Sequence, residues 1–163
     1  MFRLSNLDSR QRVILIVSLS VLAVFFSLTF PRFFVVSITK SLSHRLYWLD
    51  KDTAKIKYGD YVLFRHSDVA TQFIEQTMIK LVKCDEGDVL TVNEKKELYC
   101  NNAFIGRAKD KALNGKKLVN FVWNGPVPPG MFLPMGDHKD SYDGRYYGFL
   151  PKSKVLKKAH PVF

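Results

Sequence analysis

An uncharged apolar stretch over residues 13–30 constrains this chain more than any other feature of its sequence. As a helix rising about 1.5 Å per residue, the stretch nearly crosses a bilayer hydrocarbon core of ~30 Å. Residues 33–36 are also apolar and can extend it. The sequence therefore predicts a transmembrane anchor over residues 13–36.

Charges beside this stretch predict its orientation. Arg3, Arg10 and Arg12 precede it, and basic flanks remain on the cytoplasmic side. A cleaved signal peptide is the alternative, but its apolar core is usually ~7–15 residues and ends at a small-x-small site. Here the run is longer and Pro31 and Arg32 follow it. We expect a cytoplasmic segment over residues 1–12, an uncleaved anchor, and one exported domain over residues 37–163.

The net charge of +10 raises the question of a nucleic-acid partner. Lys and Arg are scattered as singles and pairs, and the sequence has no basic block or basic helix. A basic surface next to anionic inner-membrane lipids accounts for the charge more simply. We expect no nucleic-acid partner.

Two cysteines, Cys84 and Cys100, lie in the exported part. An even number of cysteines in an oxidising compartment indicates a disulfide. Closing a loop of this length adds about 3 kcal/mol of stability in the chain-entropy model. Two buried free thiols are the alternative interpretation.

Short apolar runs separated by Gly, Pro and Asn predict a mostly β domain of antiparallel sheets, as a sandwich or barrel. Asn101 and Asn102 separate two such runs and indicate a hairpin. Residues 119–123 read as a further strand before the Pro-rich break at residues 126–130.

The chemistry of the domain centres on Lys80, which apolar residues flank on both sides. An isolated Lys in such a run is usually an outward-facing strand residue. A buried Lys is different, because burial penalises its charged form and lowers the pKa from about 10.4. A shift of about 3 units, or ~4 kcal/mol, would yield a neutral amine near pH 7. Such an amine can deprotonate a Ser hydroxyl, and Ser41, shortly after the anchor, is the candidate.

Other catalytic chemistries find less support in the sequence. The four histidines show no metal-ligand spacing, and we expect no metal and no cofactor. A Ser-His-Asp triad that uses Ser41 and one of these histidines remains open.

Four blocks of this sequence resemble the signal peptidase I family of serine peptidases, and in particular its TraF-type members associated with conjugative transfer. The blocks follow one another in the family's order behind the predicted anchor. They cover residues 39–48, 58–64, 79–88 and 135–151.

The resemblance implies a fold of signal peptidase type and a role for each matching residue. Ser41 would be the nucleophile, Lys80 the general base, and Ser141 the residue that orients Lys80. Asp143 and Arg145 would form a supporting ion pair, because a carboxylate aimed at the amine would raise the pKa of Lys80. The remaining roles are the oxyanion hole, from the Thr39 hydroxyl and the Ser41 N–H, and the substrate pocket, lined by Leu42.

The implied activity is that of a leader peptidase in the bacterial inner membrane, with its catalytic domain in the periplasm. It would cut after small residues in an exported precursor such as a prepilin, alongside conjugative transfer components. Two alternatives are a general housekeeping leader peptidase and a catalytically silent anchor for pilus assembly.

The chain departs from the TraF-type pattern, which favours a dedicated enzyme. Ser43 and Arg45 stand where Pro and Gly are usual, and Leu81 where a basic residue is usual. Glu86 replaces the Pro of a Pro-Gly-Asp turn, and Gly144 replaces a Ser.

Overall fold

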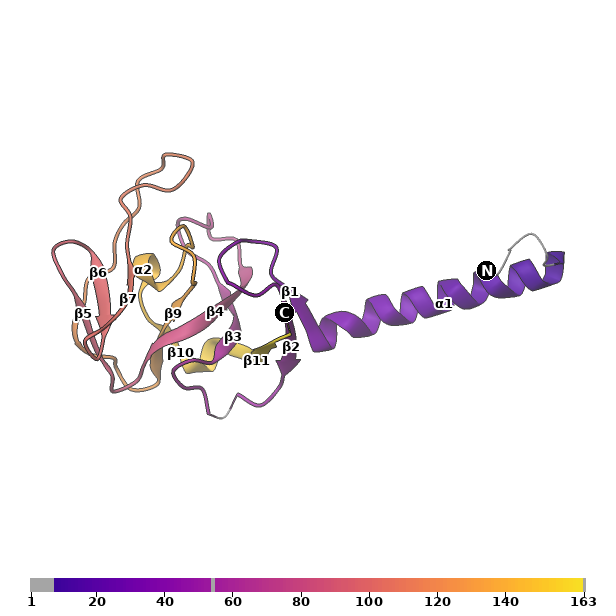
Figure 1. The fold of residues 1–163 in the computed structure, drawn as a ribbon, viewed down its shortest axis with the longest axis horizontal. Coiled ribbons are helices and arrows are strands. Elements are labelled where there is room, and N and C mark those ends of the chain that lie inside the picture. The colour runs from indigo at the N-terminus through magenta and orange to yellow at the C-terminus, as the bar shows by residue number, and fades with distance from the viewer. Residues whose placement is uncertain (1–7, 54, 163) are drawn as a thin grey trace. The chain divides into compact units, whose positions relative to one another are not determined.

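The computed structural model describes residues 8–53 and 55–162, and the chain divides into two compact units (Figure 1). The first unit is Met1–Phe34 and the second is Val35–Phe163. Each unit is described separately below.

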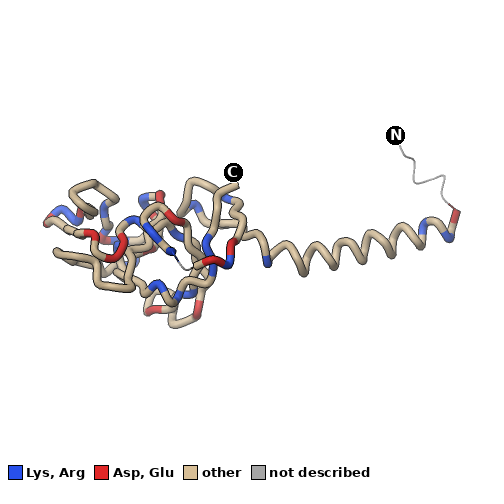
Figure 2. Tube along the Cα trace, turned by 90° about the horizontal axis from the view of Figure 1, so that it is seen from below, with Lys and Arg blue, Asp and Glu red and all other residues tan. Residues whose placement is uncertain are grey.

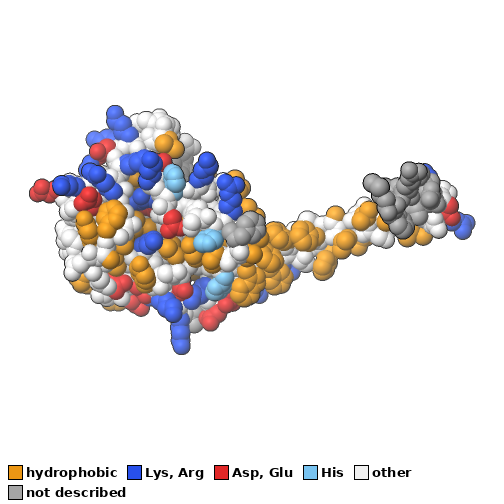
Figure 3. Space-filling view, in the orientation of Figure 1, with side chains coloured by type: hydrophobic (Ala, Val, Ile, Leu, Met, Phe, Trp, Pro, Cys, Tyr) orange, Lys and Arg blue, Asp and Glu red, His pale blue; other side chains and the backbone are white. Residues whose placement is uncertain are grey.

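Helix α1 (Ser9–Phe33) makes up most of the first unit. Asp8 and Gln11 cap its start reciprocally: Asp8 Oδ1 accepts from the Gln11 N–H at 2.8 Å, and Gln11 Oε1 accepts from the Asp8 N–H at 3.1 Å. No charged residue lies between Arg12 and Arg32 (Figure 2), and apolar side chains are exposed along the helix (Figure 3). By length and composition, α1 is the one helix in the described part of the chain that is long and apolar enough to cross a membrane.

The larger sheet of the second unit holds the strands around the candidate site. Among the described residues it has seven strands, in the order β1-β2-β11-β3-β4-β9-β10. The pairs from β2 onward are antiparallel. The strands are β1 (Phe34–Val36), β2 (Leu46–Asp50), β3 (Tyr61–His66), β4 (Gln76–Asp85), β9 (Met131–Met135), β10 (Leu150–Pro151) and β11 (Val155–Pro161).

The smaller sheet has four strands within the described residues, in the order β7-β6-β5-β8. They are β5 (Val89–Val92), β6 (Glu97–Cys100), β7 (Ala103–Arg107) and β8 (Asn124–Pro126). Asn101 and Asn102 form the two-residue turn between β6 and β7, with φ of 49° and 65°. Asn tolerates this left-handed conformation, which the tight hairpin turn requires.

The two sheets share a core and a covalent link. Cys84 on β4 and Cys100 on β6 form a disulfide and pack in one buried cluster with Leu90, Leu98 and Leu133. Residues of the larger sheet contribute to two further clusters, one around Phe64 with Phe132 and the other around Tyr47 with Leu63. The mostly β, antiparallel class predicted from the sequence is confirmed, including the preceding apolar helix.

The strand predicted over residues 119–123 is wrong. These residues have no regular structure, and β8 begins only at Asn124. The Phe121 N–H donates to the Arg145 carbonyl oxygen at 2.9 Å instead of to a neighbouring strand. Phe121 packs edge-on against Phe149, while Val119 and Val122 remain exposed. The segment therefore bonds mainly outside the sheet, and within it only the Trp123 carbonyl oxygen accepts from β5, from the Val92 N–H at 3.1 Å, among the described residues.

Two short helical segments complete the second unit. Helix α2 (Gly144–Tyr147) follows β9, and the one-turn 3-10 helix η2 (Lys152–Lys154) precedes β11.

Candidate active site

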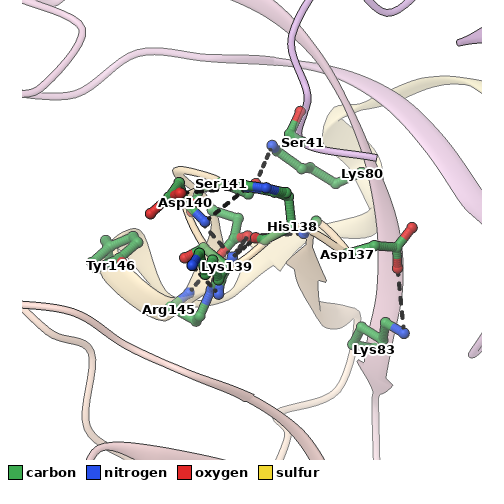
Figure 4. Close-up of polar contacts among 12 residues, drawn as sticks. Ser41, Lys80, Lys83, Asp137, His138, Lys139, Asp140, Ser141, Arg145 and Tyr146 are labelled. Atoms are coloured by element: carbon green, nitrogen blue, oxygen red, sulfur yellow. Dashed lines mark hydrogen bonds and ion pairs between the residues drawn. The ribbon is translucent and has the colours of Figure 1, made fainter. Parts of the chain in front are cut away.

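Lys80 lies in the middle of β4, between β3 and β9, and its side chain is only 5% exposed. Its amine donates a hydrogen bond to Ser141 Oγ at 2.7 Å (Figure 4). Burial lowers the pKa of Lys80 from 10.5 to about 8, more than the opposing negative charge of Asp143 raises it. A substantial fraction of this amine is therefore neutral at mildly alkaline pH.

Ser41 lies in the turn between β1 and β2 and is also buried. Its hydroxyl is 2.7 Å from Thr39 Oγ1, and its carbonyl oxygen accepts a hydrogen bond from the His138 N–H at 3.2 Å. The next residue, Leu42, is buried in the cluster with Tyr47, which anchors the turn to the sheet.

Ser41, Lys80 and Ser141 line the same cavity, which has a volume of about 1270 Å³. Thr39 lines it too, whereas Leu42 does not appear in its wall because it packs into the core. Within the described residues, Ser41 and Lys80 share no direct hydrogen bond: Ser41 bonds to Thr39, and Lys80 to Ser141. Catalytic contacts are often longer in the unliganded enzyme than in the substrate complex.

Gly136 permits the close approach of Ser141 and the Ser41 turn. No role for Gly136 was predicted from the sequence. A Cβ at this position would lie 2.3 Å from Ser141 Oγ and 2.4 Å from the Ser41 carbonyl oxygen. Any side chain would therefore push the Ser41 turn away from Ser141. The only signal in the sequence was a Gly beside Asp137 in a polar run.

Asp143 and Arg145 form a buried, bidentate ion pair. Arg145 Nη2 is 2.7 Å from Asp143 Oδ2, Nε is 2.8 Å from Oδ1, and the side chains are 3% and 0% exposed. Asp143 Oδ2 also accepts from the Gly136 N–H at 2.8 Å, and Arg145 donates to the carbonyl oxygens of His138 and Ser141. The pair thus fixes both ends of the turn that carries Ser141, and Arg145 neutralises the carboxylate near Lys80.

The packing around Asp143 and Arg145 also explains why residue 144 is a Gly. A Cβ at this position would lie 2.7 Å from the Pro134 carbonyl oxygen and 2.8 Å from Leu133 Cδ1. A Ser at this position would therefore collide with the backbone and a side chain of β9.

Among the described residues, no histidine ring forms a hydrogen bond with Ser41, although His138 lines the same cavity and its Nδ1 lies 3.7 Å from Asp140 Oδ2. His138 contacts Ser41 through its main chain, His66 pairs with Asp68 at 3.0 Å, and His44 Nδ1 lies 3.2 Å from Ser43 Oγ. Ligand atoms of Cys84, Asp88 and Cys100 lie within 4.8 Å of one another, but the two sulfurs are bonded to each other and offer no thiolate.

Comparison with known proteins identifies the class of this chain. Residues 9–163 match the model of a family described as signal peptidase, peptidase S26. The chain belongs to the signal peptidase family S26, as the four sequence blocks predicted.

One curated relative and one solved structure give the context. The chain is 41% identical over 49 residues to a protein described as conjugal transfer protein TraF from Agrobacterium fabrum; the match covers 30% of this chain and 27%, about a quarter, of that relative. It is also similar to a signal peptidase I from Enterococcus faecalis V583, with 19% identity and a TM-score of 0.42, over 63% of this chain and 95% of that one. At this TM-score the structural similarity carries no argument about the site.

Proposed function

We propose that this chain is a membrane-anchored endopeptidase that removes leader peptides from exported precursors, with Ser41 as nucleophile and Lys80 as general base. The observation that carries the proposal is the buried Lys80 amine, which is hydrogen-bonded to a neutral Ser141 hydroxyl and has its pKa lowered to about 8. A Ser hydroxyl orients the amine without stabilising its charged form. A carboxylate would stabilise that form and raise the pKa of the amine.

The reaction begins when the substrate enters the cavity and the Ser41 hydroxyl turns from Thr39 toward Lys80. Neutral Lys80 accepts the hydroxyl proton as Ser41 Oγ attacks the scissile carbonyl carbon. The Thr39 hydroxyl, released from Ser41, and the Ser41 N–H donate to the oxyanion that forms. Protonated Lys80 then gives its proton to the leaving amine, and water, deprotonated by Lys80, hydrolyses the acyl-enzyme.

The anchor places this chemistry at a membrane surface. In the proposal α1 spans the bacterial inner membrane with a cytoplasmic N-terminus, and the domain from residue 37 onward lies in the periplasm. The length, composition and basic start of α1 support this arrangement. The substrate would be an exported precursor such as a prepilin, and the relative described as conjugal transfer protein TraF supports a dedicated conjugation enzyme over a housekeeping one.

The test is cleavage of a leader-bearing precursor by the purified full-length protein in detergent. Ser41→Ala should abolish cleavage because it removes the attacking hydroxyl. Lys80→Arg should abolish cleavage because a guanidinium cannot accept the proton. Ser153→Ala and Lys154→Arg are matched controls at exposed residues outside the cavity and should retain activity. Cleavage that survives either active-site change would refute the proposed dyad. If the wild-type protein cleaves no precursor but binds pilus-assembly proteins, the silent-anchor alternative is correct.

A separate experiment addresses substrate range. A dedicated enzyme should fail to support growth of a strain depleted of its housekeeping leader peptidase, although it processes a conjugative prepilin. Rescue of growth would identify a general leader peptidase.

A further inference from the structure

Residues 136–138 contact the Ser41 turn at three points. Gly136 lies against the Ser41 carbonyl oxygen, and the His138 N–H donates to that oxygen at 3.2 Å. Between them, Asp137 Oδ2 accepts from both donors of Ser43, its N–H at 3.3 Å and its hydroxyl at 3.0 Å. Asp137 has no part in the proposed reaction, yet it holds the residue two positions after the nucleophile.

This contact depends on a residue in which the chain departs from the TraF-type pattern. Ser43 stands where Pro is usual in those sequences, and a Pro has neither an N–H nor a hydroxyl to donate. A Pro restricts the backbone of such a turn by itself, because its ring fixes φ. Ser43 supplies two donors at this position, and Asp137 binds both.

Asp137 is itself held from the strand that bears the candidate base. Its Oδ1 lies 3.6 Å from the amine of Lys83 on β4, three residues after Lys80 (Figure 4). The two side chains are 28% and 25% exposed, so solvent screens this pair only in part. One carboxylate therefore connects the turn of Ser41 with the strand of Lys80.

We propose that Asp137 is a positioning residue, whose carboxylate ties the nucleophile turn, through Ser43, to Lys83 on β4. Asp137 touches neither the reacting atoms nor the cavity wall. It acts by restricting where Ser41 can lie relative to Lys80. This inference rests on the proposed function, because it assigns Asp137 a task in the same reaction.

Kinetics of the full-length protein test the proposal. Asp137→Ala should lower kcat about tenfold to hundredfold with little change in KM, because a displacement of about 1 Å at a nucleophile costs up to ~100-fold in rate. Ser43→Ala, which keeps the N–H, should lose less. The double variant should be no slower than Asp137→Ala, since the two residues act through one contact. Asp60→Ala is the matched control, because it breaks a similarly exposed pair with Lys158 and should leave kcat unchanged.

The pH profile separates positioning beside Lys80 from a general contribution to folding. The charged groups that act on the Lys80 amine are Asp143, Arg145 and Asp137, and the Asp137 charge raises its pKa. Asp137→Asn keeps an acceptor for Ser43 but removes this charge. The rise of kcat/KM with pH should therefore move to lower pH in this variant, an effect that loss of stability alone would not produce.

Amide hydrogen exchange gives a readout that does not need activity. The Ser43 N–H should exchange faster in Asp137→Ala than in the wild-type protein and at the wild-type rate in Asp60→Ala. Unchanged exchange and unchanged kcat in Asp137→Ala would overturn the proposal. The proposal would also be overturned by two results together. In Asp137→Ala, kcat falls only as much as the free energy of unfolding does, and in Asp137→Asn, the pH profile of kcat/KM does not move. A wild-type protein without any cleavage activity would instead refute the proposed function.

Discussion

At the residue scale, burial changes the chemistry of Lys80. Its side chain is buried, and its amine donates a hydrogen bond to the neutral Ser141 hydroxyl and to no carboxylate among the described residues. Asp143 is near enough to raise its pKa, but Arg145 binds both oxygens of that carboxylate and opposes the effect. Burial therefore prevails, and the pKa of Lys80 falls to about 8.

The lowered pKa of Lys80 predicts how activity depends on pH. The amine is a base only when neutral, so kcat/KM should rise with pH through about 8 and fall about tenfold per unit below it. The check is a pH profile of the wild-type protein between pH 6 and pH 10 with a neutral substrate. A profile that is flat from pH 6 to pH 8 would contradict Lys80 as the base.

Gly144 gives a second prediction at the residue scale. Gly144→Ser should lower the free energy of unfolding by about 1–3 kcal/mol, because the new Cβ meets the Pro134 carbonyl oxygen and the Leu133 side chain in a packed region. Urea denaturation of the two proteins measures the difference. Ala103→Ser on the exposed face of β7 is the control and should stay within about 0.5 kcal/mol of wild type. Equal stability of Gly144→Ser would show that β9 yields to the added side chain.

Among the secondary-structure elements, β4 connects the parts of the domain. It pairs with β3 and β9 in the larger sheet, carries Lys80 and Lys83, and is joined through Cys84 to Cys100 of the smaller sheet. The candidate base therefore sits on the element that both sheets restrain. From this strand the Lys80 amine donates to Ser141.

Loss of the disulfide between the two sheets should lower the stability of the domain. Replacing Cys84 and Cys100 together by Ser should lower the free energy of unfolding by about 3 kcal/mol, because the bond closes a loop with a sequence separation of 16. Denaturant titration with and without reductant measures the effect. Reductant should lower the stability of the wild-type protein by a similar amount and leave the double variant unchanged. Equal stability of all four samples would contradict the prediction.

At the scale of the whole molecule, the two units differ in how their apolar residues are used. In α1 the apolar side chains are exposed along its length, and none of its residues is buried. The second unit buries its apolar side chains in three clusters of its own. Exposed apolar surface on this scale needs another partner, and the proposed bilayer supplies it.

Removal of the first unit should separate anchoring from folding. A chain that begins at Val35 should stay in solution and unfold cooperatively, because its cores are internal to Val35–Phe163. The full-length protein should instead co-sediment with lipid vesicles. The contrast is measured by vesicle sedimentation and thermal unfolding of both proteins. Equal sedimentation of the two would show that α1 is not the membrane-binding element.

Much of the fold was predictable because its signals are local. The apolar run of α1 and the Asn101–Asn102 hairpin follow from residue types at fixed spacing. The strand predicted over residues 119–123 failed because its apolar residues make contacts that no local pattern records, such as the packing of Phe121 on Phe149.

The sequence by itself determined the family, the β class, the apolar helix and the residue types available for chemistry, since these depend on composition, order and short-range spacing. Only the tertiary structure decided that Gly136 has no room for a side chain, that Gly144 packs against β9, and that Asp137 reaches Ser43 across 94 residues of chain. It also decided the pKa of Lys80, because burial is a property of the packed chain and not of the residue.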